Sequence, residues 1–113
     1  MAKKKLIIIN SKHNCAPEYV IKKTGEVLLC STRPPPEGGT GRSLTLILPR
    51  ASENAGRPIT IKDAGSYANI NNIIIERMSA DIIDGGSTRI VIDEPAGYRT
   101  FVSDGIQTWH QIG

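Results

Sequence analysis

From Ser43 onward the chain breaks into short runs of branched aliphatic residues, separated by turns rich in Gly, Asn, Asp and Pro. Residues of these turn types tolerate a positive φ or preset a bend, so each turn reverses or redirects the chain. Nowhere do apolar residues recur at the i, i+3, i+4, i+7 spacing of an amphipathic helix over three turns. The pattern predicts an all-β fold, almost without helix, with strands over residues 44–48, 59–62, 72–76, 81–83, 89–92, 100–102 and 108–112.

Isoleucine is by far the most frequent of the large apolar residues. Isoleucine accounts for 17 of the 113 residues, whereas Phe, Tyr and Trp together account for five. Branched aliphatic side chains fit the pleated surface of a sheet, and a chain with so few large rings suits thin, stacked β-layers better than a wide core. A chain of this length forms one small domain and is too short for two independent cores.

Two of the predicted strands are apolar on both faces. Most runs alternate apolar and polar residues, as in Ile59–Lys62, but Leu46–Leu48 and Ile73–Ile75 do not. A short chain has little material with which to cover both faces of such a strand. We therefore expect identical copies of the chain to supply the cover, which makes the protein an obligate oligomer. The alternative is that the N-terminal stretch covers the second face within one chain.

Composition divides the chain into three segments. Residues 1–31 form a basic segment in which the turn at Gly25 predicts a β-hairpin over Tyr19–Leu29. Residues 32–42 hold three consecutive prolines followed by several glycines, a composition typical of an extended linker. Residues 43–113 form the β-rich body.

Charge is distributed unevenly between the two halves. Residues 1–50 carry nine Lys and Arg against three Glu, a net charge of +6, and residues 51–113 carry five basic against eight acidic residues, a net charge of −3. The basic half is expected to meet an acidic surface. That surface is either nucleic acid or protein, and the absence of a nucleic-acid-binding signature favours protein, with no direct nucleic-acid contact.

Membrane insertion, export and cofactor chemistry are not indicated. The longest apolar run, Leu6–Ile9, is far shorter than the roughly 20 residues of a membrane span, and polar residues follow it too soon for a secretory signal. Cys15 and Cys30 are expected to be reduced, buried thiols, although the sequence leaves open whether they pair. Together with His13 they give too few ligands at too irregular a spacing for zinc. We expect neither metal nor cofactor.

The sequence does not favour an enzymatic function. Carboxylates at turns, in principle, provide the pair that a glycosidase needs, but an Asp before Gly is also what turn geometry selects. The sequence contains no nucleophile elbow and no phosphate-binding loop. The single Trp109 is expected to cap the core, with stacking on a sugar ring as the alternative. The carboxylates concerned are Asp81, Asp84, Asp93, Glu94 and Asp104.

The second half of the chain resembles a module of tailed-bacteriophage virion proteins, found in fibres, spikes and capsid decoration (cement) proteins. The resemblance covers roughly residues 57–113, about half of the chain, and depends on the order of several short motifs. These motifs are Pro58-Ile-Thr-Ile-Lys-Asp63, Asn71-Asn-Ile-Ile-Ile75, Asp81-Ile-Ile-Asp-Gly85, Ile90-Val-Ile92, and Phe101-Val-Ser-Asp-Gly105 followed by Trp109.

The resemblance implies a β-solenoid-like or interlocked short-strand module that forms a homotrimer without catalytic chemistry. Under this interpretation the trimer core consists of Ile59, Ile61, Ile73, Ile74, Ile75, Ile90, Ile92 and Trp109. The extended N-terminal segment would attach the trimer to an acidic capsid surface through Lys3, Lys4, Lys5, Lys12, Lys22 and Lys23.

The functional expectation is a decoration protein on the outer surface of a phage capsid, assembled in the host cytoplasm. It would bind the major capsid protein and stabilise the contacts between capsid subunits. The alternatives are a short tail or neck fibre or spike adaptor and, in a different class, a module that binds or degrades carbohydrate.

Overall fold

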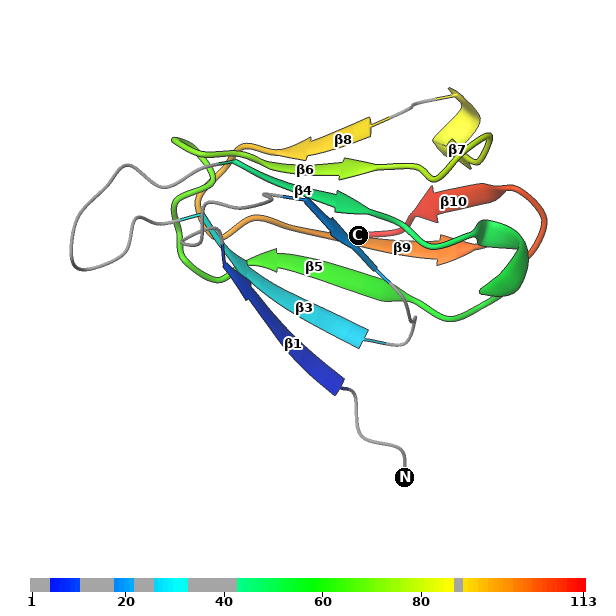
Figure 1. Ribbon diagram of the computed structural model, residues 1–113, viewed down its shortest axis with the longest axis horizontal. Helices are drawn as coiled ribbons and strands as arrows, with labels where there is room; N and C mark the ends of the chain where they lie inside the picture. The colour runs from blue at the N-terminus through cyan, green and yellow to red at the C-terminus, as the bar shows by residue number, and fades with distance from the viewer. Residues whose placement is uncertain (1–4, 11–17, 22–25, 33–42, 87–88) are drawn as a thin grey trace.

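The structure is a computed structural model of the 113-residue chain (Figure 1). It describes residues 5–10, 18–21, 26–32, 43–86 and 89–113, with the main chain alone for residues 5–10, 18 and 26. The strands are β1 (Lys5–Asn10), β2 (Glu18–Val20), β3 (Glu26–Ser31), β4 (Leu44–Ile47), β5 (Ile59–Asp63), β6 (Ile73–Glu76), β7 (Ile82–Ile83), β8 (Arg89–Ile92), β9 (Tyr98–Ser103) and β10 (Thr108–Gln111).

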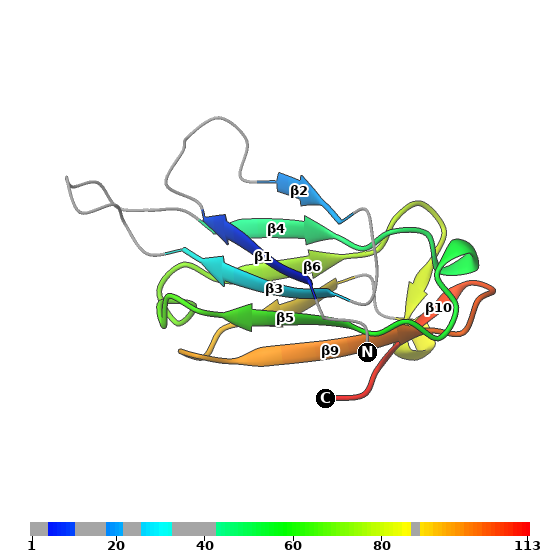
Figure 2. The same ribbon diagram turned by 90° about the horizontal axis from the view of Figure 1, so that it is seen from below.

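The strands form two sheets that lie as separate layers in Figure 1, and Figure 2 looks onto the larger sheet from below, with the smaller sheet behind it. One sheet has six strands in the order β1-β3-β5-β9-β10-β7, and the other has four in the order β2-β4-β6-β8. Both sheets mix parallel and antiparallel pairs, and neither is closed or curled. The predicted all-β fold is confirmed at this level.

The first six strands alternate between the two sheets. The odd-numbered strands β1, β3 and β5 pair in parallel in the larger sheet, and β2, β4 and β6 pair in parallel in the smaller one. A parallel pair cannot be closed by a tight turn, because the chain must first return to the starting end of the sheet. Here it returns as a strand of the opposite sheet.

This alternation corrects the hairpin predicted over Tyr19–Leu29. β2 pairs with β4 in the smaller sheet, whereas β3 pairs with β1 and β5 in the larger one. The two strands therefore lie in different layers. Sequence proximity favoured a hairpin, but each strand instead gains parallel partners and turns alternate side chains into the space between the sheets. Ile21, Leu28 and Cys30 are buried there.

The remaining strands add antiparallel pairs, except β7, which lies parallel to β10. β8 lies antiparallel to β6, and β9 lies antiparallel to β5 and to β10. Of the strands described, β9 and β10 are the one consecutive pair that joins directly as a hairpin. The seven strands predicted from Ser43 onward are all present, and each lies within two residues of its predicted bounds.

Helical structure is confined to two short 3₁₀ turns in the part of the chain that is described. They span Ala51–Glu53 (η1) and Asp84–Gly86 (η2). The expected scarcity of helix is confirmed for these residues. Neither turn approaches the length that a membrane-crossing helix needs.

The core lies between the sheets and follows from strand alternation, because every second side chain of a strand points to the same face. In β5 and β6 the residues at alternate positions are fully covered. Phe101 and Trp109 are the largest buried side chains and come from the larger sheet. The cluster is completed by Ile21, Leu28, Cys30, Leu44, Leu46, Leu48, Ala51, Ile59, Ile61, Ala68, Ile73, Ile75, Ile83 and Ile92.

The N-terminal strands are part of both sheets. β3 lies between β1 and β5, and β2 forms an edge of the smaller sheet. Residues from the predicted attachment segment 1–31 therefore share one core with the predicted body 43–113. In the predicted linker, the Thr32 hydroxyl is buried and donates to the carbonyl oxygen of Asn71, 2.5 Å away. Residues 33–42 lie outside the described part of the chain.

Two neighbouring residues of β5 provide a test of this packing. Ile61 points into the core and is fully buried, whereas Thr60 points outward and its hydroxyl lies 3.0 Å from that of Thr100. We expect Ile61→Ala to lower the free energy of unfolding by about 2–5 kcal/mol because it leaves a cavity. Thr60→Ala should cost only about 1 kcal/mol, the value of one hydrogen bond. Urea denaturation followed by circular dichroism measures both, and equal costs would contradict the assigned register.

Candidate functional site

The residues predicted to form a trimer core are mostly buried within a single chain. Six of the eight are fully covered in one copy, which corrects their assignment to contacts between chains. The physical reason is that the two sheets of the same chain face each other, so each covers the inner face of the other. These six are Ile59, Ile61, Ile73, Ile75, Ile92 and Trp109.

The other two predicted residues differ from each other. Ile90 is half-buried and packs against the edge of the core. Ile74 lies between the inward-pointing Ile73 and Ile75, so it points to the outer face of the smaller sheet, where it is half-buried. Of the predicted trimer core, Ile74 is therefore the residue whose side chain lies on the outer face of a sheet.

The outer face of the smaller sheet carries further apolar side chains beside Ile74. In the register of the sheet, Thr45, Ile74 and Val91 form one row across β4, β6 and β8. Val20 and Ile47 lie side by side in the neighbouring row, which continues with the charged pair Glu76 and Arg89, and Val20 is 41% exposed. We call Val20, Thr45, Ile47, Ile74 and Val91 the outer apolar face. Sequence reasoning missed Val20, Ile47 and Val91, although the doubly apolar run Leu46–Leu48 was a signal for Ile47.

Trp109 closes one end of the core. Its ring is fully buried, and its Nε1–H donates to the carbonyl oxygen of Pro49 at 3.0 Å. The buried indole N–H therefore has a hydrogen-bond acceptor and needs no water molecule as a partner. The ring offers no face for a sugar to stack on, so the capping role expected from the sequence agrees with its position.

Asp63 holds two loops together at one end of the larger sheet. Its side chain is 1% exposed, and Oδ2 accepts N–H groups from Tyr67, Ala68 and Ala96 at 2.9–3.0 Å. The carboxylate thus joins the loop after β5 to the turn before β9. Oδ1 has no hydrogen-bond partner among the described residues. The sequence placed Asp63 at the start of a predicted turn. It gave no sign that the distant turn at Ala96 would also donate a hydrogen bond to its carboxylate.

Cys30 pairs with Asp63 in the register of the larger sheet, and its thiol is expected to be unreactive. The thiol is buried, and burial together with the negative charge of Asp63 raises its pKa to about 12. At neutral pH almost none of it is the reactive thiolate. The expected burial is confirmed for Cys30, while Cys15 and His13 lie outside the described residues.

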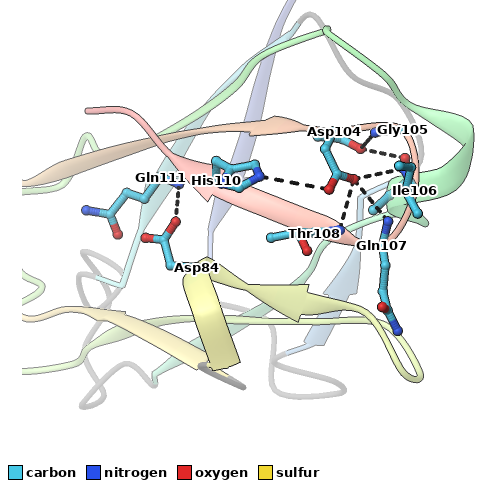
Figure 3. A network of polar contacts seen from close by, with 10 residues as sticks. Asp84, Asp104, Gly105, Ile106, Gln107, Thr108, His110 and Gln111 are labelled. Carbon is cyan, nitrogen blue, oxygen red and sulfur yellow. Dashed lines mark hydrogen bonds and ion pairs between the residues drawn. The ribbon is translucent and has the colours of Figure 1, made fainter.

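The turn between β9 and β10 is organised by Asp104 (Figure 3). Oδ1 accepts the N–H groups of Ile106, Gln107 and Thr108 at 2.8, 3.0 and 3.1 Å. These three bonds stabilise the ionised carboxylate and hold the pKa of Asp104 below its ordinary value of 3.8. Gly105 follows with a φ of +79°, a conformation that suits glycine.

Two further side chains contact this region (Figure 3): His110, which lies on β10, and Asp84, which lies in η2 beside it. His110 Nε2 lies 3.9 Å from Asp104 Oδ2, the outer limit of an ion pair. Asp84 Oδ1 accepts the N–H of Gln111 at 3.0 Å. Both carboxylates therefore bind main-chain amides, which is a structural role for the Asp-Gly turns singled out in the sequence.

Two of the other three turn carboxylates are also engaged, whereas Asp93 is exposed. Asp81 Oδ2 accepts the N–H of Ala51 at 2.8 Å, and Glu94 Oε1 pairs with Arg99 Nη1 at 2.8 Å. Within the described ranges, His, Cys, Asp and Glu form no group of three or more that is able to hold a metal ion. Asp81, Asp84 and Asp104 therefore stabilise the main chain at their turns.

The predicted capsid-binding lysines lie almost entirely outside the described residues. Lys5 begins β1, where only the main chain is described. The others are Lys3, Lys4, Lys12, Lys22 and Lys23. Comparison with known proteins adds no relative: the sequence matches no family model and no curated protein.

The Asp104 turn gives a prediction about pH. The folded-state pKa of Asp104 is lower than its unfolded value, so the carboxylate stabilises the fold above the unfolded pKa and loses this effect as pH falls through the folded pKa. We expect Asp104→Asn to be less stable than the native chain at pH 6, with the difference narrowing at pH 2. Urea denaturation at both pH values measures it.

The control for this prediction is Asp93→Asn, which removes an exposed carboxylate at the end of β8. It should change the stability little at either pH. The free energies of unfolding of the native chain and of Asp104→Asn should differ less at pH 2 than at pH 6. An equal difference at both pH values would contradict the role given to the ionised Asp104.

Proposed function

We propose that this chain is a structural protein of a tailed-bacteriophage virion, and specifically a decoration protein that binds the outer capsid shell as a homotrimer. The observation that carries the proposal is the outer apolar face of the smaller sheet. A sheet face that is apolar after folding is complete is typical of a surface that contacts another protein. The motif order in residues 57–113 supplies the link to virion proteins.

The face suits an association between identical chains. Its apolar members are already partly covered by their neighbours, so complete burial would add about 1 kcal/mol for each, roughly half the value for a fully exposed side chain. Four such side chains in each of three copies give a sum of the same order as the cost of ordering the chains in a complex. The burial of one residue would not offset the cost of association, whereas the burial of the whole outer apolar face would.

We further propose a solenoid-like winding for β1–β6 within the trimer. What supports it is the strict alternation of these strands between two sheets with parallel pairing in each. Each pair of strands then acts as one coil stacked on the preceding coil. A stack of this kind presents flat outer faces, which are suited to side-by-side packing of copies.

The proposed mechanism is mechanical and not enzymatic. Each trimer would cover a junction between major capsid protein subunits, adding buried area that resists the pressure of the packaged DNA. The cluster Lys3–Lys5, with Lys12, Lys22 and Lys23, would provide a salt-sensitive attraction to an acidic shell surface. What supports a structural role is that Asp84 and Asp104, both at Asp-Gly turns, bind main-chain amides.

The trimer is tested by changing its proposed contact. Light scattering of the purified chain should give about three times the 12.2 kDa mass of one copy. Ile74→Asp should give a monomer, because association would bury an unpaired carboxylate at a cost of several kcal/mol. Thr60→Asp is the matched control, since Thr60 is also half-buried on the outer face of a middle strand but in the other sheet.

A native chain that remains monomeric at micromolar concentration would contradict the trimer. Equal masses for Ile74→Asp and Thr60→Asp would show that the outer apolar face is not the contact.

The place in the virion is tested by counting copies. Quantitative mass spectrometry of purified particles should find hundreds of copies for each particle, as expected for a protein that covers a shell. Cryo-electron microscopy should place them on the capsid. A few copies at one vertex would instead identify a fibre or spike adaptor.

A further inference from the structure

We propose that a small polar pocket at the edge of the smaller sheet binds the carboxylate of an Asp or Glu side chain presented by an extended segment of a partner protein. The pocket has a volume of about 260 Å³ and is lined by Glu76, Arg77, Ser79 and Arg89. None of these residues was singled out by the sequence analysis. The inference goes beyond the proposed function and does not depend on the trimer.

Each arginine is oriented by polar contacts within the chain, Arg77 by two carbonyl oxygens and the 57% exposed Arg89 by one ion pair. Arg77 Nη1 donates to the carbonyl oxygens of Ser79 and Asp81 at 2.9 and 3.1 Å. Arg89 Nη2 lies 2.9 Å from Glu76 Oε2, across the antiparallel pair of β6 and β8. Each guanidinium carries five N–H donors in a rigid plane. In the described part of the chain, Arg77 Nε and Nη2 and Arg89 Nε and Nη1 have no hydrogen-bond partner.

The charge of the lining selects the ligand. Two guanidinium groups and one carboxylate leave a net charge of +1, which one carboxylate ion neutralises and a phosphate dianion would exceed. Guanidinium groups bind carboxylates with paired, parallel hydrogen bonds, so the geometry of the donors agrees with the charge. The volume is smaller than that of a typical drug-sized site, which begins near 300 Å³. It is suited to one side chain and its ordered water.

The position at the sheet edge indicates a protein ligand. β8 pairs with β6 on one side and, among the described strands, has no neighbour on the other; Figure 1 shows it as the outermost strand. An extended segment can add to such an edge through main-chain hydrogen bonds while a pocket selects one of its side chains. Arg89 is the first residue of β8 and belongs both to this edge and to the pocket.

The lining does not favour a sugar acid, the main alternative source of a carboxylate. Its four residues include no aromatic ring on which a sugar could stack. The polar groups of the pocket would bind the carboxylate, and the main chain of the ligand would contact β8.

The experiment measures the binding of two synthetic peptides to the full chain. The peptides are acetyl-VTVEVT-amide and its Glu-to-Gln analogue, titrated by calorimetry and by amide NMR shifts. We expect the Glu peptide to bind about tenfold more tightly, the effect of one charge-assisted hydrogen-bond pair. The shifts should lie in residues 76–79 and 89–92.

Three variants sharpen the test. Arg89→Gln should weaken the Glu peptide about tenfold, and Glu76→Gln should strengthen it because a competing carboxylate is removed. Arg57→Gln, at an exposed arginine before β5, should leave binding unchanged. NMR spectra of the free variants establish that they are folded.

The proposal is overturned if the two peptides bind equally, if neither binds at millimolar concentration, or if Arg89→Gln has no effect. Binding of glucuronate as tight as that of the Glu peptide would also overturn it and assign the pocket to a sugar acid. Repeating the titration with Ile74→Asp separates the pocket from the trimer. Peptide binding by that variant supports the pocket whatever the oligomeric state of the native chain.

Discussion

The packing of alternate side chains between the two sheets is the constraint on which the rest of the structure depends. Each strand is short and supplies at most two buried apolar residues to the core among the residues described, so no strand is stable without both its sheet neighbours and the opposite layer. Branched aliphatic residues fill this thin space, and Phe101 and Trp109 occupy the places where a larger volume must be filled. The outward positions are then free to serve other purposes.

The turns between short strands need their own stabilisation, and carboxylates provide much of it. Asp63, Asp81, Asp84 and Asp104 all accept main-chain N–H groups that would otherwise be unsatisfied. Asp63 is the most deeply placed of them and connects two loops that are far apart in the sequence. Three of the five carboxylates that suggested a catalytic pair in the sequence, Asp81, Asp84 and Asp104, thus have a structural role at the main chain.

The outer surface of the smaller sheet combines an apolar centre with a charged end. Ile74 and Val91 lie in adjacent strands, and the Glu76–Arg89 pair follows where β6 ends and β8 begins. Protein interfaces commonly have an apolar centre and a polar rim. The proposed trimer contact and the proposed carboxylate pocket are therefore two parts of one surface, and each is defined by different side chains.

The sequence by itself determined the positions of the strands after Ser43 and the absence of regular helix in that region. It did so because turn chemistry and the alternation of apolar residues are local properties. It also indicated that Ile73–Ile75 and Leu46–Leu48 need cover on both faces. Only the tertiary structure decided what provides that cover: the larger sheet of the same chain covers Ile73 and Ile75, and Ile74 remains outside. The partner of each strand, the joining of two loops by Asp63 and the pocket beside Arg89 depend on contacts between distant residues, and no local pattern specifies which of several equally apolar strands will lie opposite another.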